Sequence, residues 1–136
     1  MLLAVPQTYV NDSGVAARAL WRRYLGPEAS GEQLLLVHDE LDLPPGVVRV
    51  KMGGGTAGHN GLRSVQSHLR TNQFARVRIG VGKPPSAAAG AHHVLRRPSR
   101  REREIFDVAV EVAADAVEVV LAEGVGAAMN RFNTRP

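Results

Sequence analysis

The sequence predicts an α/β fold, with a mixed, mostly parallel twisted sheet flanked by helices. Three observations favour it. Residues 33–38 form a continuous apolar run, as strands do when both faces of their sheet are covered. Residues 47–52 and 74–81 alternate apolar and basic side chains, the pattern of strands with one apolar face. Residues 14–25 and 101–123 repeat apolar side chains at helical spacing. Strands that alternate with helices in this way favour a layered α/β architecture.

In the first half of the chain, the helix at 14–25 is expected to end at Gly26-Pro27. The strand at 33–38 is separated from the strand at 47–52 by a turn at 43–46, since proline fixes φ and glycine tolerates positive φ. A glycine-rich loop over 53–61 then leads into a short helix that runs to about Arg70.

In the second half, the strand at 74–81 places Arg76 and Arg78 on one face. Residues 83–92 are rich in proline, alanine and glycine, which indicates a loop. Gly124 is expected to end the long helix, and a last short helix is expected over 127–132. The predicted apolar stripe of the long helix consists of Ile105, Val108, Val112, Ala116, Val119 and Val120.

The composition is that of an ordinary globular protein, with 136 residues, 44% of them hydrophobic and 22% charged. This length suits one domain that comprises residues 1–136. The absence of cysteine excludes disulfides, thiolate nucleophiles and cysteine-based zinc sites. No apolar run reaches the ~18 residues of a membrane span, so a cytoplasmic protein without membrane contact is expected.

Charge is strongly segregated along the chain, although the formal net charge is only +4. Residues 43–101 contain 11 lysines and arginines and no aspartate or glutamate, and acidic segments lie on both sides. A stretch of this kind is a candidate footprint for a polyanion such as RNA. The alternative is a solvated basic face that only improves solubility.

The glycine-rich loop, GGGTAGHNG, contains three glycines that formally match the dinucleotide-binding pattern G-x-G-x-x-G. That pattern also needs an acidic residue ~20 positions further on, and none occurs before Glu102. A P-loop is excluded because His59 and Asn60 stand where Lys and Ser or Thr are required. The loop and the helix N-terminus remain suited to close approach by a phosphate or a main chain. Alternatively, Asn60 simply caps the helix and His59 is a solvated loop residue.

An acidic cluster, His38-Asp39-Glu40-Leu41-Asp42, follows the apolar strand. Sites in open α/β sheets gather outside the carboxyl ends of strands, where a carboxylate commonly orients a histidine base. His38 and Asp39 are neighbours in a strand, so they are expected to point to opposite faces. A metal site formed by His38, Asp39 and Asp42 has no recognisable spacing, and a charged turn is the simpler alternative.

A third polar cluster, PQTYVNDSG, precedes the first helix, and in it Asn11 or Ser13 is a candidate cap. Taken together, the clusters resemble the motifs of bacterial peptidyl-tRNA hydrolases in order and approximate spacing: PQTYVNDSG, VHDELDLPPG, KMGGGTAGHNGL and FARVRIGVGKPP. The resemblance runs from about Leu3 to Gly82 and continues more loosely through HHVL to AAMNRFN. That family cleaves the ester that joins a peptide to the 3′ end of tRNA.

The resemblance implies that Asp39 orients a catalytic histidine and that Asn60 helps to position the attacking water. It also implies that no cofactor, metal or covalent intermediate is needed, and that the protein is a monomer whose partner is peptidyl-tRNA. The residues expected to bind the peptide or the tRNA are Tyr9, Asn11, Lys51, His59 and Arg78.

Members of that family carry further residues ahead of the PQTYVN motif, among them the base histidine. We therefore expect this chain, which starts at Met1 just before that motif, to lack that segment and its own base. His38 and His59 are the nearby candidates to substitute for it, although the family uses neither as the base. The alternative function is a tRNA- or RNA-binding protein without catalysis on the same scaffold.

Overall fold

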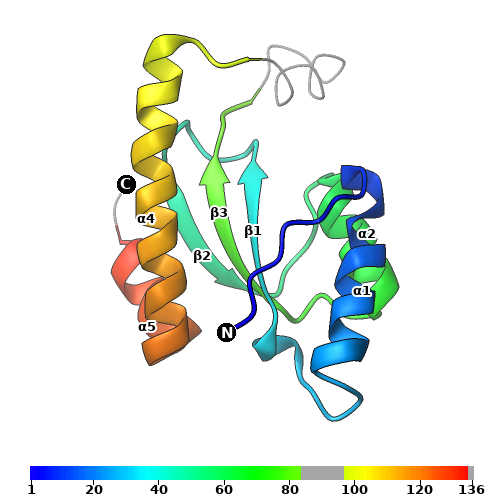
Figure 1. Ribbon diagram of the computed structural model, residues 1–136. Helices are drawn as coiled ribbons and strands as arrows, with labels where there is room; N and C mark the ends of the chain where they lie inside the picture. The colour runs from blue at the N-terminus through cyan, green and yellow to red at the C-terminus, as the bar shows by residue number, and fades with distance from the viewer. Residues whose placement is uncertain (84–96, 135–136) are drawn as a thin grey trace. The chain divides into compact units, whose positions relative to one another are not determined.

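A computed structural model describes residues 1–83 and 97–134 of the chain (Figure 1). Only residue 83 of the expected loop at 83–92 is described, and the HHVL motif lies outside the described residues. The chain divides into two compact units, residues 1–34 with 53–74 and residues 35–52 with 75–136. The prediction that residues 1–136 form one domain stays a prediction.

The second unit contains a three-stranded sheet in the order β1-β3-β2. Strand β1 (Leu35–Glu40) pairs in parallel with β3 (Ala75–Gly80), and β2 (Val48–Met52) pairs with β3 in the antiparallel direction. The predicted α/β class with a mixed sheet is therefore confirmed. The predicted turn between β1 and β2 is also present, with Gly46 at a φ of 86°.

The strand register separates the sheet into an apolar and a basic face. Val48 and Val50 of β2 lie opposite Ile79 and Val77 of β3, which gives one apolar face. On the other face, two cross-strand pairs consist only of basic residues: Arg49 opposite Arg78, and Lys51 opposite Arg76. The alternation predicted for both strands from the sequence is confirmed.

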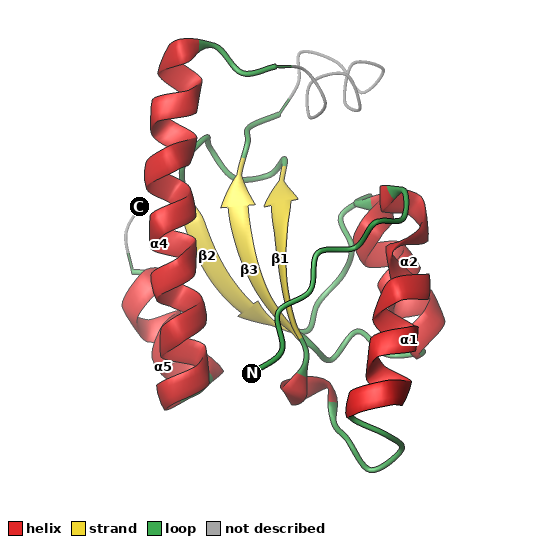
Figure 2. Cartoon of the chain, in the orientation of Figure 1, coloured by secondary structure: helices red, strands yellow, loops and turns green. Residues whose placement is uncertain are grey.

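Helices α4 (Arg100–Glu123) and α5 (Val125–Phe132) cover the apolar face (Figure 2). Helix α4 begins with a capping box between Ser99 and Glu102, which the sequence analysis did not identify. Gly124 ends α4 as expected, with a φ of 94°. The buried core of this unit consists of Val48, Val50, Val77, Ala109, Ala113, Ala116 and Ala128.

The apolar stripe predicted for α4 was partly wrong. Of the predicted residues, Ala116 is buried and Val112, Val119 and Val120 pack against the core. Val108, however, is 61% exposed and Ile105 is 36% exposed, whereas Ala109 and Ala113, which were not in the predicted stripe, are buried. Three small side chains at i, i+4 and i+7 let the helix backbone approach the sheet closely, so these alanines face the core in place of the larger residues.

Strand β1 was expected to be covered on both faces, and this expectation was also wrong. Val37 lies on the same face as Val77, yet its side chain is 52% exposed. The reason is that β1 is an edge strand of the described sheet, while α4 and α5 pack mainly against β2 and β3.

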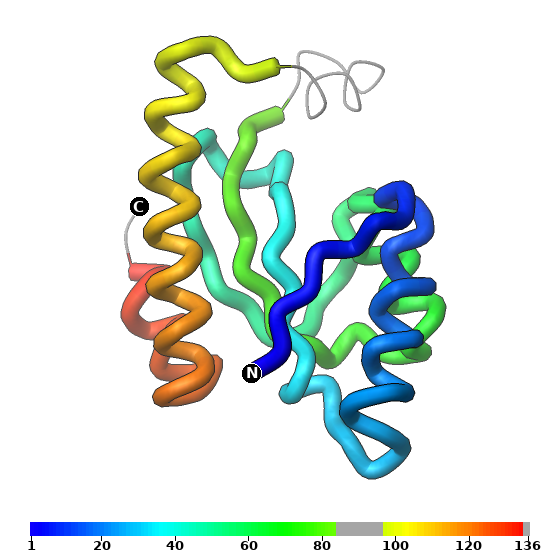
Figure 3. The backbone as a smooth tube through the Cα atoms, in the orientation of Figure 1, coloured from blue at the N-terminus to red at the C-terminus, as the bar shows by residue number. Residues whose placement is uncertain are grey.

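The first unit is built on helices α1 (Ser13–Tyr24) and α2 (Asn60–Leu69), which pack side by side (Figure 3). They cross where the Gly14 backbone N–H donates a hydrogen bond of 2.9 Å to the Ser64 hydroxyl oxygen. Both residues are buried, and a Cβ atom at Gly14 would overlap the Ser64 carbonyl oxygen. The close contact of the two helices therefore depends on glycine at position 14.

Replacing Gly14 with alanine is expected to lower the free energy of unfolding by about 2 kcal/mol, because the added methyl group overlaps backbone. Urea denaturation followed by circular dichroism measures this loss. The matched control is Gly126→Ala in α5, where nothing lies within 4 Å of the added atom. That control is expected to be neutral or mildly stabilising, since alanine is the better helix former. Equal stability of the two variants would contradict the prediction.

Candidate active site

Two parallel helices bring predicted site residues together in the first unit. A 3-10 turn, Val10–Asp12, leads into α1 and contacts the start of α2. About one turn toward the C-terminus of both helices, Gly14 of α1 is hydrogen-bonded to Ser64 of α2. Still further in the same direction, Arg18 of α1 lines a hollow together with Arg70, which follows α2. The helices consequently run in the same direction, so Asn11 and Asn60 lie at the same end of the pair.

The helix cap falls on a different residue from the one considered in the sequence analysis. His59 is the N-cap of α2, and its Nδ1 accepts a hydrogen bond of 3.2 Å from the Leu62 backbone N–H. His59 is therefore half-buried in a structural role and is not a solvated loop residue. Asn60 is the first helical residue, so its amide is not consumed by capping.

Asn11 is likewise not a cap. Helix α1 has no side-chain cap, and the Ser13 hydroxyl donates to the Val10 carbonyl at 2.8 Å. Asn11 and Asn60 are both exposed, and no side-chain hydrogen bond of either occurs among the described residues. The positive ends of two helix dipoles thus meet beside two available amides, an arrangement suited to a phosphate or a polarised carbonyl. Tyr9, which is 87% exposed, lies just before this 3-10 turn.

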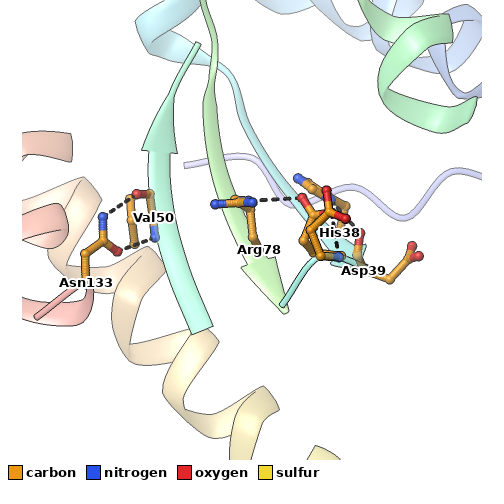
Figure 4. A network of polar contacts seen from close by, with 7 residues as sticks. His38, Asp39, Val50, Arg78 and Asn133 are labelled. Atoms are coloured by element: carbon orange, nitrogen blue, oxygen red, sulfur yellow. Dashed lines mark hydrogen bonds and ion pairs between the residues drawn. The ribbon is translucent and has the colours of Figure 1, made fainter. Parts of the chain in front are cut away.

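Asp39, the carboxylate among the predicted site residues, belongs to the second unit. Asp39 is half-buried in β1, and the register places it on the same face as Ile79, whereas His38 shares a face with Arg78. His38 Nδ1 lies 2.8 Å from the Asp39 main-chain oxygen, so this contact does not join the imidazole to the carboxylate (Figure 4). The expectation that the two neighbours point to opposite faces is confirmed.

Lys51 and Arg78 share the basic face of the sheet as diagonal neighbours, since Lys51 lies opposite Arg76. The Arg78 Nε atom donates to the Glu40 carboxylate at 3.1 Å, as Figure 4 shows. Glu40 is 8% exposed, and its second oxygen accepts the Asp42 backbone N–H at 3.3 Å. Arg78 is thereby held through Nε, which leaves its terminal nitrogens for a further acceptor such as a phosphate.

The environment of the basic face of the sheet lowers the pKa of one of its arginines, Arg76. Burial lowers the pKa of Arg76, the neighbouring charge of Arg78 lowers it further, and Glu40 acts in the opposite direction. Glu40, which holds Arg78, was part of the predicted acidic cluster but had no predicted role. Its position on the same strand face as His38, and hence as Arg78, was the signal that could have identified it.

The described residues contain no metal-binding cluster and no membrane-spanning helix. Among them, no group of three histidine, aspartate or glutamate side chains could hold a metal ion. No helix within the described ranges is long and apolar enough to cross a membrane.

Comparison with known proteins gives the context for this arrangement. The family model described as peptidyl-tRNA hydrolase matches residues 1–136. The chain belongs to the peptidyl-tRNA hydrolase family. A relative named peptidyl-tRNA hydrolase from Rubrobacter xylanophilus is 51% identical over 134 residues, which cover 98% of this chain and 70% of the relative. The corresponding protein of Cutibacterium acnes is 46% identical and is covered to 66%.

Solved structures of peptidyl-tRNA hydrolases have the same fold. The crystal structure of the enzyme from Acinetobacter baumannii matches with a TM-score of 0.86 and 39% identity, over 95% of this chain and 64% of that chain. A structure of a peptidyl-tRNA hydrolase complex with N-propanol matches equally well, also at a TM-score of 0.86. The chain therefore spans about two thirds of the length of these peptidyl-tRNA hydrolases.

Proposed function

We propose that this chain carries the substrate-binding part, and part of the catalytic apparatus, of a peptidyl-tRNA hydrolase. The observation that carries the proposal is the pair of exposed amides, Asn11 and Asn60, at the shared N-terminal end of α1 and α2. Membership of the family supplies the reaction, because the matching residues stand in its motifs. The substrate is peptidyl-tRNA, recognised through both the tRNA acceptor end and the peptide.

In the proposed reaction, a water oxygen attacks the carbonyl carbon of the ester between the peptide and the tRNA 3′ end. The bond from that carbon to the ribose oxygen then breaks, which gives a peptide carboxylate and a free tRNA hydroxyl. Asn60 holds the attacking water and Asn11 binds the substrate beside it, with Tyr9 supplying exposed aromatic surface near the peptide. No metal, cofactor or covalent intermediate is part of this proposal.

Lys51 and Arg78 are proposed to bind a phosphate of the tRNA. They are diagonal neighbours on the basic face of the sheet, and Arg78 is fixed through Nε by Glu40. A guanidinium held in this way loses less conformational freedom when it binds a phosphate. His59 contributes by capping α2, which places Asn60 in the first helical position.

We further propose that the general base is not among residues 1–136, and that Asp39 orients a histidine supplied from elsewhere. Two observations support this. His59 Nδ1 is occupied by the Leu62 N–H, and His38 lies on the opposite strand face from Asp39. We also propose that the enzyme is a monomer and that it acts in the cytoplasm.

The test is hydrolysis of peptidyl-tRNA by two proteins: the 136-residue chain, and the same chain extended at its N-terminus by the corresponding segment of a relative. The extended chain is expected to release tRNA rapidly, and the 136-residue chain much more slowly. Rapid turnover by the short chain would contradict the proposal about the base. Binding of tRNA without turnover by the extended chain would favour the alternative, a non-catalytic RNA-binding protein.

A further inference from the structure

Two open hollows lie side by side on the outside of the α1–α2 pair, within the first unit. The first, of about 650 Å³, is lined by Thr56, Arg63, Gln66, Ser67, Arg70, Thr71 and Asn72. The second, of about 800 Å³, is lined by Arg18, Trp21, Arg22, Ala29, Gly31, Ser67, His68, Leu69, Arg70 and Thr71. They share Ser67, Arg70 and Thr71, so they form one continuous depression. We call it the arginine groove.

The charge of the arginine groove has one sign. No aspartate or glutamate is among its described lining residues. The lining includes four exposed arginines, Arg18, Arg22, Arg63 and Arg70. No ion pair formed by any of these arginines occurs among the described residues. Four positive charges that share one concave surface with no acidic residue in its lining attract a polyanion.

Helical spacing explains why these side chains meet. Arg18, Trp21 and Arg22 stand at i, i+3 and i+4 on α1, and therefore occupy one face of that helix. Arg63 lies in the first turn of α2 and Arg70 is the C-cap of that helix, with a left-handed φ of 58°, and both line the first hollow. The Gly14–Ser64 contact then brings the two sets of residues together along one side of the pair.

The lining argues against a small apolar ligand. All seven residues of the first hollow have polar side chains, whereas pockets for small molecules are mostly apolar and enclosed. Hydroxyl, amide and guanidinium groups are instead the donors that bind phosphodiester oxygens in nucleic-acid complexes. Trp21 adds a half-buried aromatic surface to the second hollow.

We propose that the arginine groove binds the phosphate backbone of the tRNA body, away from the ester. This inference rests on the proposed function, since it takes tRNA as the substrate. Asn60 and Arg70 are ten residues apart, or about 15 Å along the helix axis. A nucleic-acid strand places a phosphate about every 3.4 Å along a duplex. At that spacing the far end of the groove, at Arg70, lies more than about four phosphates beyond the nucleotide that Asn11 and Asn60 hold, and therefore on the tRNA body.

The test compares the wild-type chain with the variant Arg18→Gln/Arg22→Gln/Arg63→Gln/Arg70→Gln. The probe is deacylated tRNA, and its affinity is measured by fluorescence anisotropy over a range of salt concentrations. The slope of log K against log[salt] is expected to become shallower by about 3.6, since each of the four lost contacts to duplex phosphate removes about 0.9. Circular dichroism and thermal melting verify that the variant folds.

The matched control is Arg23→Gln. Arg23 is also exposed on α1, next to Arg22, but it lies over the Tyr24 ring at 5.4 Å and lines neither hollow. It is expected to leave the slope within about 0.5 of the wild-type value, because it contacts no phosphate. A second probe, a single-stranded trinucleotide with the tRNA 3′-terminal sequence, spans too few phosphates to reach Arg70 and is expected to bind the wild type and the quadruple variant equally.

An unchanged salt slope for the quadruple variant would overturn the arginine groove as a tRNA contact, and so would an equal loss of affinity for the short RNA. Neither result depends on hydrolysis. Failure of the proposed function would appear separately, as absence of ester cleavage by the extended chain. Its failure and that of the arginine groove are therefore distinguishable.

Discussion

Replacing Asp39 with asparagine in the N-terminally extended chain is expected to reduce the rate of peptidyl-tRNA hydrolysis by about 10²- to 10⁴-fold. A carboxylate that accepts the N–H of a histidine fixes its tautomer and stabilises its positive charge during proton transfer. An asparagine amide can present a donor instead and carries no charge. Because orientation of the base is lost and substrate contacts remain, the change should appear in the single-turnover rate rather than in affinity for tRNA.

The control for this substitution is Asp42→Asn. Asp42 is exposed in the loop after β1, and its carboxylate forms an ion pair of 3.5 Å with the exposed Lys83. A pair of this kind contributes little to stability, and we expect the control to retain its rate within about twofold. Wild-type turnover by Asp39→Asn, or an equal loss in both variants, would show that Asp39 does not orient the base.

Replacing Asn133 with alanine is expected to lower the free energy of unfolding by about 3 kcal/mol, the largest loss of stability that we predict. The Asn133 amide nitrogen donates to the Val50 carbonyl at 2.7 Å, and its oxygen accepts the Val50 N–H at 2.8 Å (Figure 4). Val50 is 1% exposed, so alanine would leave two buried backbone groups without their partner. Urea denaturation measures the loss, and we expect the transition midpoint to fall while the m-value stays unchanged.

Asn130→Ala provides the matched control, because Asn130 lies in the last turn of α5, of which Asn133 is the C-cap, but is exposed. Its effect is expected to stay within about 0.5 kcal/mol. If Asn133→Ala were as stable as this control, the two hydrogen bonds to Val50 would not contribute to the stability of the unit. These two hydrogen bonds matter structurally because β2 is an edge strand of the described sheet. The Asn133 amide takes the place that a peptide group of a neighbouring strand would occupy.

Local patterns predicted much of the second unit. Alternation in residues 47–52 and 74–81 predicted both strands and the face to which each basic side chain points, because side chains in a strand alternate strictly. Helical spacing and Gly124 predicted the extent of α4. The burial of Ala116 was predicted, but that of Ala109 and Ala113 was not, because hydrophobicity favours larger residues and does not show how closely a helix approaches its sheet.

The arrangement of the first unit could not be predicted in the same way. Its decisive contact, Gly14 to Ser64, joins residues 50 positions apart, and no local pattern encodes the direction in which α2 runs beside α1. The same contact groups Arg18 and Arg22 with Arg63 and Arg70, although only the latter two belong to the carboxylate-free segment 43–101. The cap of α2 was missed because histidine is not among the residues strongly preferred at that position.

The Gly14–Ser64 contact also determines how the two asparagines can move. Asn11 precedes Gly14 by three residues and Asn60 precedes Ser64 by four, so each amide stands about one helical turn from the same fixed point. A rotation of either helix about that point therefore moves its amide through an arm of only about one turn. Such a rotation changes the alignment of the proposed ester-binding groups less than it displaces the far ends of α1 and α2.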